Sequence, residues 1–301
     1  MSDPGKVRLK DRIEYAAVLA VANCLQALPV ETAAAFCGFC WRHIASRTRR
    51  QKRVLAHLRL AFPHLTDNEV KKLSLRVWDN LGRVMAETLH LRTLRGRALE
   101  SPHDHSRVGP VREHVDHGLV VASGHIGAYE LIVVAALQVG AKPAGIYQEL
   151  KNPLVDRYLA DLRRPMFPAG LFSKSHKAAR QVLGIVKAGG TAAFLADQRE
   201  IKGVKIRFFG QPAYANPFPA MLARHCAVPF MAGRIIRRLD GTYMIDADEV
   251  PVPADGSSAA ALLAATQNFH DVLERYIREY PEQWMWTHRK WALPEGETEA
   301  A

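Results

Sequence analysis

Residues 119–134, LVVASGHIGAYELIVV, decide how the larger part of the chain folds. The apolar residues 119–122 predict a short buried strand, a Ser-Gly pair ends it, and the apolar run from Glu130 predicts a buried helix. His125 therefore lies at the carboxyl end of a strand, where α/β proteins usually place their chemistry. A carboxylate near such an imidazole can fix its tautomer and stabilise its protonated form. We interpret His125 as a general base for a hydroxyl and Glu130 as its partner, although a single His-x4-Glu pair is also common in purely structural settings.

Beyond residue 118 the chain alternates predicted strands and helices. We expect strands at residues 119–122, 144–147, 191–196, 230–237 and 243–247, and helices at 131–139, 153–163, 177–187, 220–225 and 259–279. Residues 11–100 instead indicate helices joined by short turns, one of them opened by the capping box of Thr66 and Glu69. The pattern predicts an α/β fold: a mostly parallel central sheet wrapped by helices, with an N-terminal helical layer. We expect a helical region at 1–100, one integrated α/β domain at 101–293 and a disordered tail at 294–301.

The formal net charge of +11 favours anionic partners, which include nucleic acid, an anionic membrane and an acidic protein. No basic–aromatic RNA signature or recognition-helix pattern is visible, so we expect no nucleic acid partner. Four cysteines are too few for a disulfide framework and favour a reducing compartment. We interpret Cys37 and Cys40 as buried small residues in a helix rather than a redox or zinc motif. His103, His105, His114 and His117 cluster in what looks like an exposed linker, so we predict no metal site there.

An apolar N-terminal stretch followed by a basic cluster indicates association with a membrane. Residues 15–30 carry no charge, but these 16 positions fall short of the roughly 20 needed to span a bilayer. A second apolar stretch, residues 32–41, runs into a cluster of basic side chains: Arg42, Arg47, Arg49, Arg50, Lys52, Arg53 and Arg59. This is typical of a segment lying on an anionic cytoplasmic leaflet. A single N-terminal span and an ordinary helical layer with a solvated basic face remain alternatives.

Three further polar signals follow predicted strands or open predicted helices. The first is Asn152, leading toward Arg163 and Arg164. The second is Asp197-Gln198, directly after an apolar strand. The third is the sequence FFG at residues 208–210, followed by an Asn-Pro helix entry. Each signal alone is weak, since a helix N-cap has the same appearance. The chain has no G-x-S-x-G elbow, which argues against a serine hydrolase.

Together these motifs resemble the bacterial lipid A late (secondary) acyltransferases of the lysophospholipid acyltransferase superfamily. That family carries H-x4-[DE] after an apolar strand, an N-x-L…R segment, a D-Q strand end, an F-F-G motif and a C-terminal P-E-Q-[YW]-x-W-x-H-R. Here the last block is PEQWMWTHR at residues 281–289, the most specific single piece. The resemblance extends from about residue 10 to residue 292. One departure follows Asp197-Gln198: many relatives carry an acidic residue and glycine, whereas this chain has Arg199-Glu200, which bears on the local loop and acceptor choice.

The resemblance implies transfer of a fatty acyl chain from acyl carrier protein, an acidic partner, to a hydroxyl of a Kdo-bearing lipid A precursor. It implies no cofactor and no metal, with acyl-ACP or acyl-CoA as co-substrate, at the cytoplasmic face of the inner membrane among its anionic lipids. His125 and Glu130 would be catalytic. The expected substrate-binding or oxyanion residues are Arg163, Asp197, Gln198, Asn152, Arg164 and Arg289.

Some choices remain open at the level of the sequence. Arg199, Lys202, Lys205 and Arg207 could receive sugar phosphates or acidic acyl carrier protein. The tryptophans near the C-terminus, Trp284, Trp286 and Trp291, are expected to be partly core. An alternative function is an acyl-CoA-dependent acyltransferase acting on another glycolipid, such as a phosphoinositide mannoside.

Overall fold

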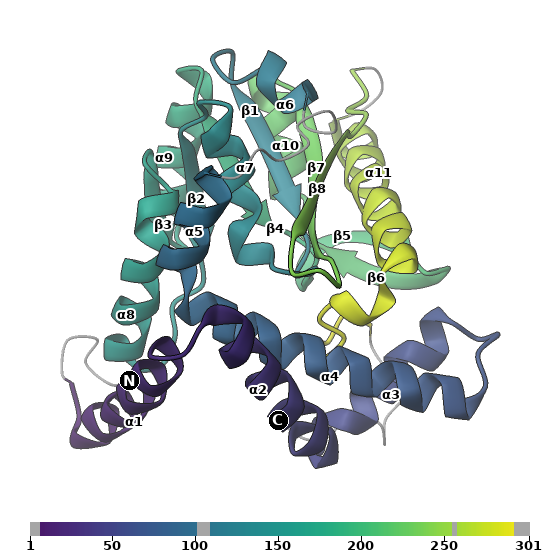
Figure 1. Cartoon of the computed structure of the whole chain (residues 1–301). Coiled ribbons are helices and arrows are strands. Elements are labelled where there is room, and N and C mark those ends of the chain that lie inside the picture. Colours follow the sequence, from purple (N-terminus) through teal and green to yellow (C-terminus); the bar gives the residue numbers. More distant parts are fainter. Residues whose placement is uncertain (1–6, 101–108, 255–257, 292–301) are drawn as a thin grey trace.

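A computed structural model describes residues 7–100, 109–254 and 258–291 (Figure 1). Residues 7–100 form the predicted helical layer; residues 9–89 lie below the sheet in that view, and residues 91–100 lie at the level of the sheet. Its helices are α1 (Leu9–Gln26), α2 (Val30–His43), α3 (Arg50–Ala61), α4 (Asp67–Leu89) and α5 (Leu91–Glu100), with a 3₁₀ turn at Ala45–Arg47. The capping box opening α4 is confirmed: Glu69 N donates to Thr66 Oγ1 at 3.3 Å, and Glu69 Oε2 accepts from Thr66 N at 2.8 Å.

Helices α2 and α4 cross at unusually close range because each has a glycine at the crossing. A Cβ atom on Gly82 would come within 2.3 Å of the Cys37 carbonyl oxygen. Cys37 is buried at this crossing, and burial raises the pKa of its thiol. All four cysteines are free thiols. In the described part of the chain, no helix combines the length and apolar character needed to cross a bilayer.

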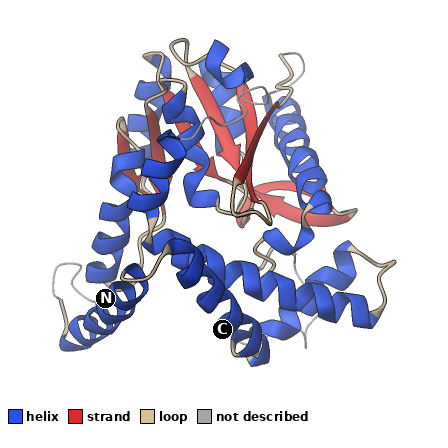
Figure 2. Cartoon of the chain, viewed as in Figure 1, coloured by secondary structure: helices blue, strands red, loops and turns tan. Residues whose placement is uncertain are grey.

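The predicted mostly parallel sheet is confirmed (Figure 2). Six strands lie in the order β3-β2-β4-β1-β7-β8, all neighbours parallel except the antiparallel pair β7–β8. They are β1 (Leu119–Ser123), β2 (Pro143–Tyr147), β3 (Gly170–Ser173), β4 (Thr191–Leu195), β7 (Phe230–Arg237) and β8 (Tyr243–Glu249). β1 and β4 are neighbours in register, with Ser123 opposite Leu195, so their carboxyl ends meet at one edge of the sheet.

Helices cover both faces of the sheet, as predicted. One face carries α9 (His176–Lys187), α10 (Phe218–Cys226) and α11 (Ser258–Glu279). The other carries α7 (Ile132–Gln138) and the short α6 (Gly109–Glu113), while α8 (Pro153–Arg163) packs against α1 and α5. Short 3₁₀ turns stand at Tyr129–Leu131, Arg164–Met166 and Pro281–Gln283.

Three strands were not predicted. β3 is a four-residue strand of half-buried residues at the sheet edge, too short for a periodic pattern. β5 (Arg199–Phe208) and β6 (Gln211–Ala215) form a separate antiparallel hairpin that packs on α11. The hairpin buries Ile206, Phe208 and Ala213 and turns Lys205 and Arg207 outward.

An aromatic core joins the hairpin, the helical layer and the C-terminal segment. Trp284, Trp286 and Trp291 are each at most 3% exposed and pack with Phe208 and Phe209. The expectation that these tryptophans belong to the core is therefore met in full. The predicted tail at 294–301 and two of the clustered histidines, His103 and His105, lie outside the described residues.

Candidate active site

His125 stands in the loop that follows β1, and the C-terminal segment fixes that loop. Ile126 forms an isolated antiparallel bridge with Trp284. Gly127 N donates to the Gln283 carbonyl at 2.8 Å, and Met285 N donates to the His125 carbonyl at 3.1 Å. Gly127 has a φ of +58°, and a Cβ there would lie 1.9 Å from the Ile235 carbonyl oxygen. Only glycine fits this turn, because both the backbone conformation and the space exclude a side chain.

The carboxylate in contact with His125 is Asp197, which follows the neighbouring strand β4. Its Oδ1 accepts from His125 Nδ1 at 2.7 Å, and its Oδ2 accepts from His125 N at 2.9 Å and Trp284 Nε1 at 2.8 Å. The Asp197 side chain is fully buried. Burial favours its neutral form, but the charge and hydrogen bonds of His125 prevail and hold the pKa of Asp197 well below its ordinary value. Because an ionised carboxylate only accepts, Nδ1 of His125 carries a proton, and in the neutral imidazole the lone pair is then on Nε2.

The Gln198 amide faces Nε2 of His125. Gln198 Nε2 lies 3.4 Å from His125 Nε2 and 3.3 Å from His288 Nε2. The rings of His288 and Tyr129 each stand edge-on to the His125 ring, with centroids 4.8 Å away. Burial and the neighbouring His125 lower the pKa of His288 to about 4, so this imidazole is neutral at pH 7. The arrangement puts an amide donor beside Nε2 of His125.

Glu130, the expected partner of His125, pairs with Arg163 instead. Arg163 Nε donates to both carboxylate oxygens, at 3.1 and 3.0 Å, and Nη2 donates to Oε1 at 2.5 Å. The 3₁₀ turn Tyr129–Leu131 directs Glu130 toward the last turn of α8, where Arg163 lies. Burial disfavours the charge of Arg163, but Glu130 outweighs it and raises the pKa of Arg163. His125 and Glu130 are therefore close in sequence but have different hydrogen-bond partners: Asp197 for His125 and Arg163 for Glu130.

The other expected site residues lie outside this cluster. Asn152 is the N-cap of α8: its Oδ1 accepts from Leu154 N at 3.0 Å, and its Nδ2 donates to the Asp11 carbonyl at 2.9 Å. Arg164 is largely exposed and pairs with Asp161 at 3.2 Å. Arg289 is exposed beside Arg53, where burial and then the charge of Arg289 lower the pKa of Arg53.

Sequence reasoning missed three residues that contact His125 or Asp197: Tyr129, Trp284 and His288. Trp284 and His288 belong to the C-terminal block at residues 281–289, from which only Arg289 was expected in the site, while Trp284 was expected to be partly core. Within residues 7–100, 109–254 and 258–291, no group of three or more His, Cys, Asp or Glu side chains is arranged to hold a metal ion.

A buried carboxylate, an imidazole with a free nitrogen and a facing amide define an enzyme site that can activate a hydroxyl. The sequence profile of the bacterial lipid A biosynthesis acyltransferases matches residues 5–292, nearly the whole chain. The chain belongs to this family and is an O-acyltransferase of lipid A biosynthesis. A comparison with curated proteins found no match.

Proposed function

We propose that the protein transfers a fatty acyl chain from an acyl carrier protein thioester to a hydroxyl of a Kdo-bearing lipid A precursor, with His125 as the general base. The observation that carries this proposal is the contact of His125 Nδ1 with Asp197, which leaves Nε2 beside the Gln198 amide. Asp197 takes the orienting role that the sequence suggested for Glu130.

The reaction follows from these positions. His125 Nε2 takes the proton of the acceptor hydroxyl, and the oxygen attacks the thioester carbonyl. The Gln198 amide donates to the resulting oxyanion, since it lies beside the nitrogen that activates the nucleophile. When the tetrahedral intermediate collapses, the carbon–sulfur bond breaks and the thiolate takes the proton from the His125 imidazolium. Asp197 stabilises that imidazolium through Nδ1.

Arg163 is assigned to the acceptor's phosphate or to the oxyanion, with Glu130 holding its guanidinium in place. The Arg163 and Glu130 side chains are 23% and 11% exposed, so the pair is not sealed off from solvent, and its charges act on Tyr129, the ring beside His125. A guanidinium fixed on one side by a carboxylate presents the remaining donors in a defined direction, as phosphate recognition requires.

The outward face of the β5–β6 hairpin supports an acidic protein as donor. Lys202, Lys205 and Arg207 are exposed on β5, and the strand begins two residues after Asp197. Tyr214 on β6 is paired opposite Lys205. A positive face beside the site can steer an acidic carrier and hold it while its acyl chain reaches His125.

The helical layer supports attachment to an anionic membrane surface. Large apolar side chains are exposed on α1 and α2 and directly after α2: Leu9, Ile13, Val21, Phe36, Phe39 and Ile44. The exposed basic residues Arg42, Arg47, Arg49 and Arg50 follow in the chain. Exposed apolar side chains next to cations fit the boundary between acyl chains and anionic headgroups.

The direct test is to incubate the purified, detergent-solubilised protein with a Kdo-bearing tetra-acylated lipid A precursor and a panel of acyl carrier protein thioesters, and to weigh the lipid by mass spectrometry. We expect the mass to rise by one acyl group. If acyl-CoA serves and no carrier thioester does, the proposed donor is wrong. If the precursor gains nothing from any donor, the proposed acceptor is wrong.

A further inference from the structure

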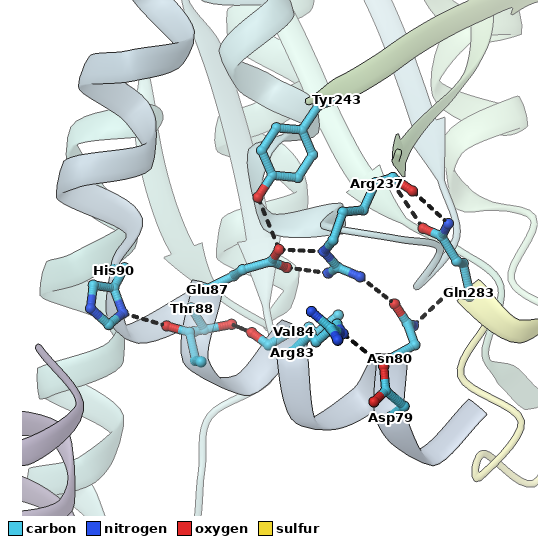
Figure 3. Close-up of polar contacts among 11 residues, drawn as sticks. Asp79, Asn80, Arg83, Val84, Glu87, Thr88, His90, Arg237, Tyr243 and Gln283 are labelled. Carbon is cyan, nitrogen blue, oxygen red and sulfur yellow. Dashed lines mark hydrogen bonds and ion pairs between the residues drawn. The ribbon is translucent and has the colours of Figure 1, made fainter. Parts of the chain in front are cut away.

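We infer that a buried polar network between α4, β7 and the C-terminal segment positions the loop that carries His125. The network consists of Asn80 and Glu87 on α4, Arg237 at the end of β7, and Gln283 (Figure 3). Of these four residues only Gln283 was named above, as the acceptor of the Gly127 amide, and none was assigned a role in the reaction. The inference rests on the proposed function, because it concerns the geometry of the proposed base.

Gln283 is the network's link to the loop. Its carbonyl accepts from Gly127 N at 2.8 Å, two residues after His125. The next residue, Trp284, donates to Asp197, and the one after it, Met285, donates to the His125 carbonyl. A shift of Gln283 would therefore move both the loop and the indole that fixes Asp197.

The Arg237 main chain and the Asn80 side chain together make three hydrogen bonds with Gln283. Its Oε1 accepts from Arg237 N at 3.0 Å, and its Nε2 donates to the Arg237 carbonyl at 2.9 Å. Asn80 Nδ2 donates to the Gln283 carbonyl at 3.2 Å, so this oxygen accepts from Asn80 and Gly127 together. Gln283 is thereby fixed through its amide side chain and its carbonyl (Figure 3).

An ion pair holds the network itself. Arg237 Nε donates to Glu87 Oε1 at 2.5 Å, and Nη2 donates to Glu87 Oε2. Nη1 donates to Asn80 Oδ1 at 2.8 Å, and Tyr243 Oη donates to Glu87 Oε1 at 2.9 Å. The Arg237 and Glu87 side chains are 12% and 5% exposed.

The many hydrogen bonds of this network argue that it positions Gln283 and does not only stabilise the fold. Replacing a buried ion pair by apolar side chains often leaves stability unchanged or higher, because desolvation offsets the attraction. A fully satisfied network can instead fix one geometry of its members. Here the member that it fixes, Gln283, is the residue bonded to the loop of His125.

The test uses the full-length protein and the variants Asn80→Ala and Glu87→Gln, with Arg234→Gln as matched control. Arg234 lies three residues earlier on β7, is also buried, and pairs with Asp246 and Glu279 at 2.7 Å without touching Gln283. The Arg234→Gln substitution should lower the free energy of unfolding by a similar amount without moving the loop of His125. Hydrogen exchange of the peptide containing Gly127 and the kinetics of acyl transfer are both measured, each per folded molecule.

We expect both network variants to exchange the Gly127 amide about tenfold faster, since its acceptor is no longer held. We expect kcat to fall about 10- to 100-fold with KM for the acyl donor nearly unchanged, the pattern of a misplaced base. The control should change neither. If the network variants lose only thermal stability, as the control does, the inference is overturned. If Glu87→Gln fails to fold, the inference is tested by Asn80→Ala alone, because that variant leaves the ion pair between Arg237 and Glu87 intact. If the network variants exchange faster but the wild-type protein transfers no acyl group, the positioning of the loop is supported and the proposed function is refuted.

Discussion

Asp197 Oδ1 accepts a hydrogen bond from His125 Nδ1 at 2.7 Å across 72 positions of sequence. The contact exists because β1 and β4 are adjacent and parallel, so the residues that follow them meet at one edge. Glu130, much nearer in sequence, is held by Arg163. In the proposed mechanism the two carboxylates therefore have separable roles: Asp197 would orient the base, and Glu130 would orient a cation.

Substituting each carboxylate by its amide separates these roles. We expect Asp197→Asn to reduce kcat by about 10³- to 10⁴-fold, because an amide favours the wrong tautomer of His125 and cannot stabilise its imidazolium. Glu130→Gln should cost less, about 10- to 100-fold, because it loosens Arg163 and leaves the base oriented. The measurement is steady-state transfer at saturating donor. Equal losses in the two variants, or a larger loss in Glu130→Gln, would contradict the assignment of Asp197.

Gly127 offers a test of the loop geometry. We expect Gly127→Ala to destabilise the protein by about 2 kcal/mol or more and to abolish most transfer, because the methyl group would overlap the Ile235 carbonyl and the φ is unfavourable. Gly140→Ala is the control: its φ is +89°, but nothing lies within 4 Å of the added atom. That variant should lose about 1 kcal/mol of unfolding free energy and keep its activity. Normal activity in Gly127→Ala would show that the loop tolerates movement.

Much of the fold could be predicted from local pattern, and the site only in part. Strand β7 and helix α8 were predicted to the residue, because β7 is apolar apart from Arg234 and its terminal Arg237, and α8 opens on an Asn-Pro cap. His125 was singled out from its place after an apolar strand, whereas Asp197 and Gln198 entered the candidate site through the family resemblance. The contact between His125 and Asp197 was not predicted, because it depends on which strands become neighbours. Trp284 and His288 reach the site through a segment whose bridge to Ile126 has no local sequence signal.

Buried neutral histidines predict a loss of stability at mildly acidic pH. Burial lowers the pKa of His57 to about 4 and that of His270 well below its ordinary value. Below pH 6.5 the unfolded chain binds protons that the folded protein does not, so stability falls as the pH drops from 6.5 toward 4. Each group should contribute about 1.4 kcal/mol per pH unit in this window. Urea denaturation at intervals between pH 7.5 and 4.5 measures the slope.

His57→Gln is the control for that slope. Glutamine can still bond the Trp286 carbonyl, which His57 Nδ1 contacts at 3.0 Å, but it does not titrate. The variant's slope should be smaller by about 1.4 kcal/mol per pH unit. A wild-type stability that stays constant from pH 6.5 to 4.5 would show that these histidines are protonated in the folded protein.

Charge reversal on the hairpin tests the acidic donor. We expect Lys202→Glu combined with Lys205→Glu to raise KM for an acyl carrier protein thioester about tenfold, because repulsion replaces attraction at the docking face. The effect should shrink at high salt, which screens exposed charges. An acyl-pantetheine donor, which has no acidic surface, should be unaffected. Lys142→Glu, an exposed lysine that precedes β2 at the opposite edge of the sheet, is the control. If the donors respond alike, the hairpin contacts the acceptor instead.

The exposed aromatic side chains of α2 test attachment to the membrane. Phe36 and Phe39 are 57% and 61% exposed and one helical turn apart, so they lie on the same face. Each phenyl group that enters the acyl region should contribute about 1.5–3 kcal/mol, so Phe36→Ser and Phe39→Ser should each weaken vesicle binding about tenfold or more. Co-sedimentation with vesicles containing anionic lipid measures this, and binding should also fall with salt, since the neighbouring arginines take part. Leu239→Ser, at a fully exposed leucine in the β7–β8 turn, should bind as the wild type does. Equal binding by all variants would mean that α2 faces away from the lipid.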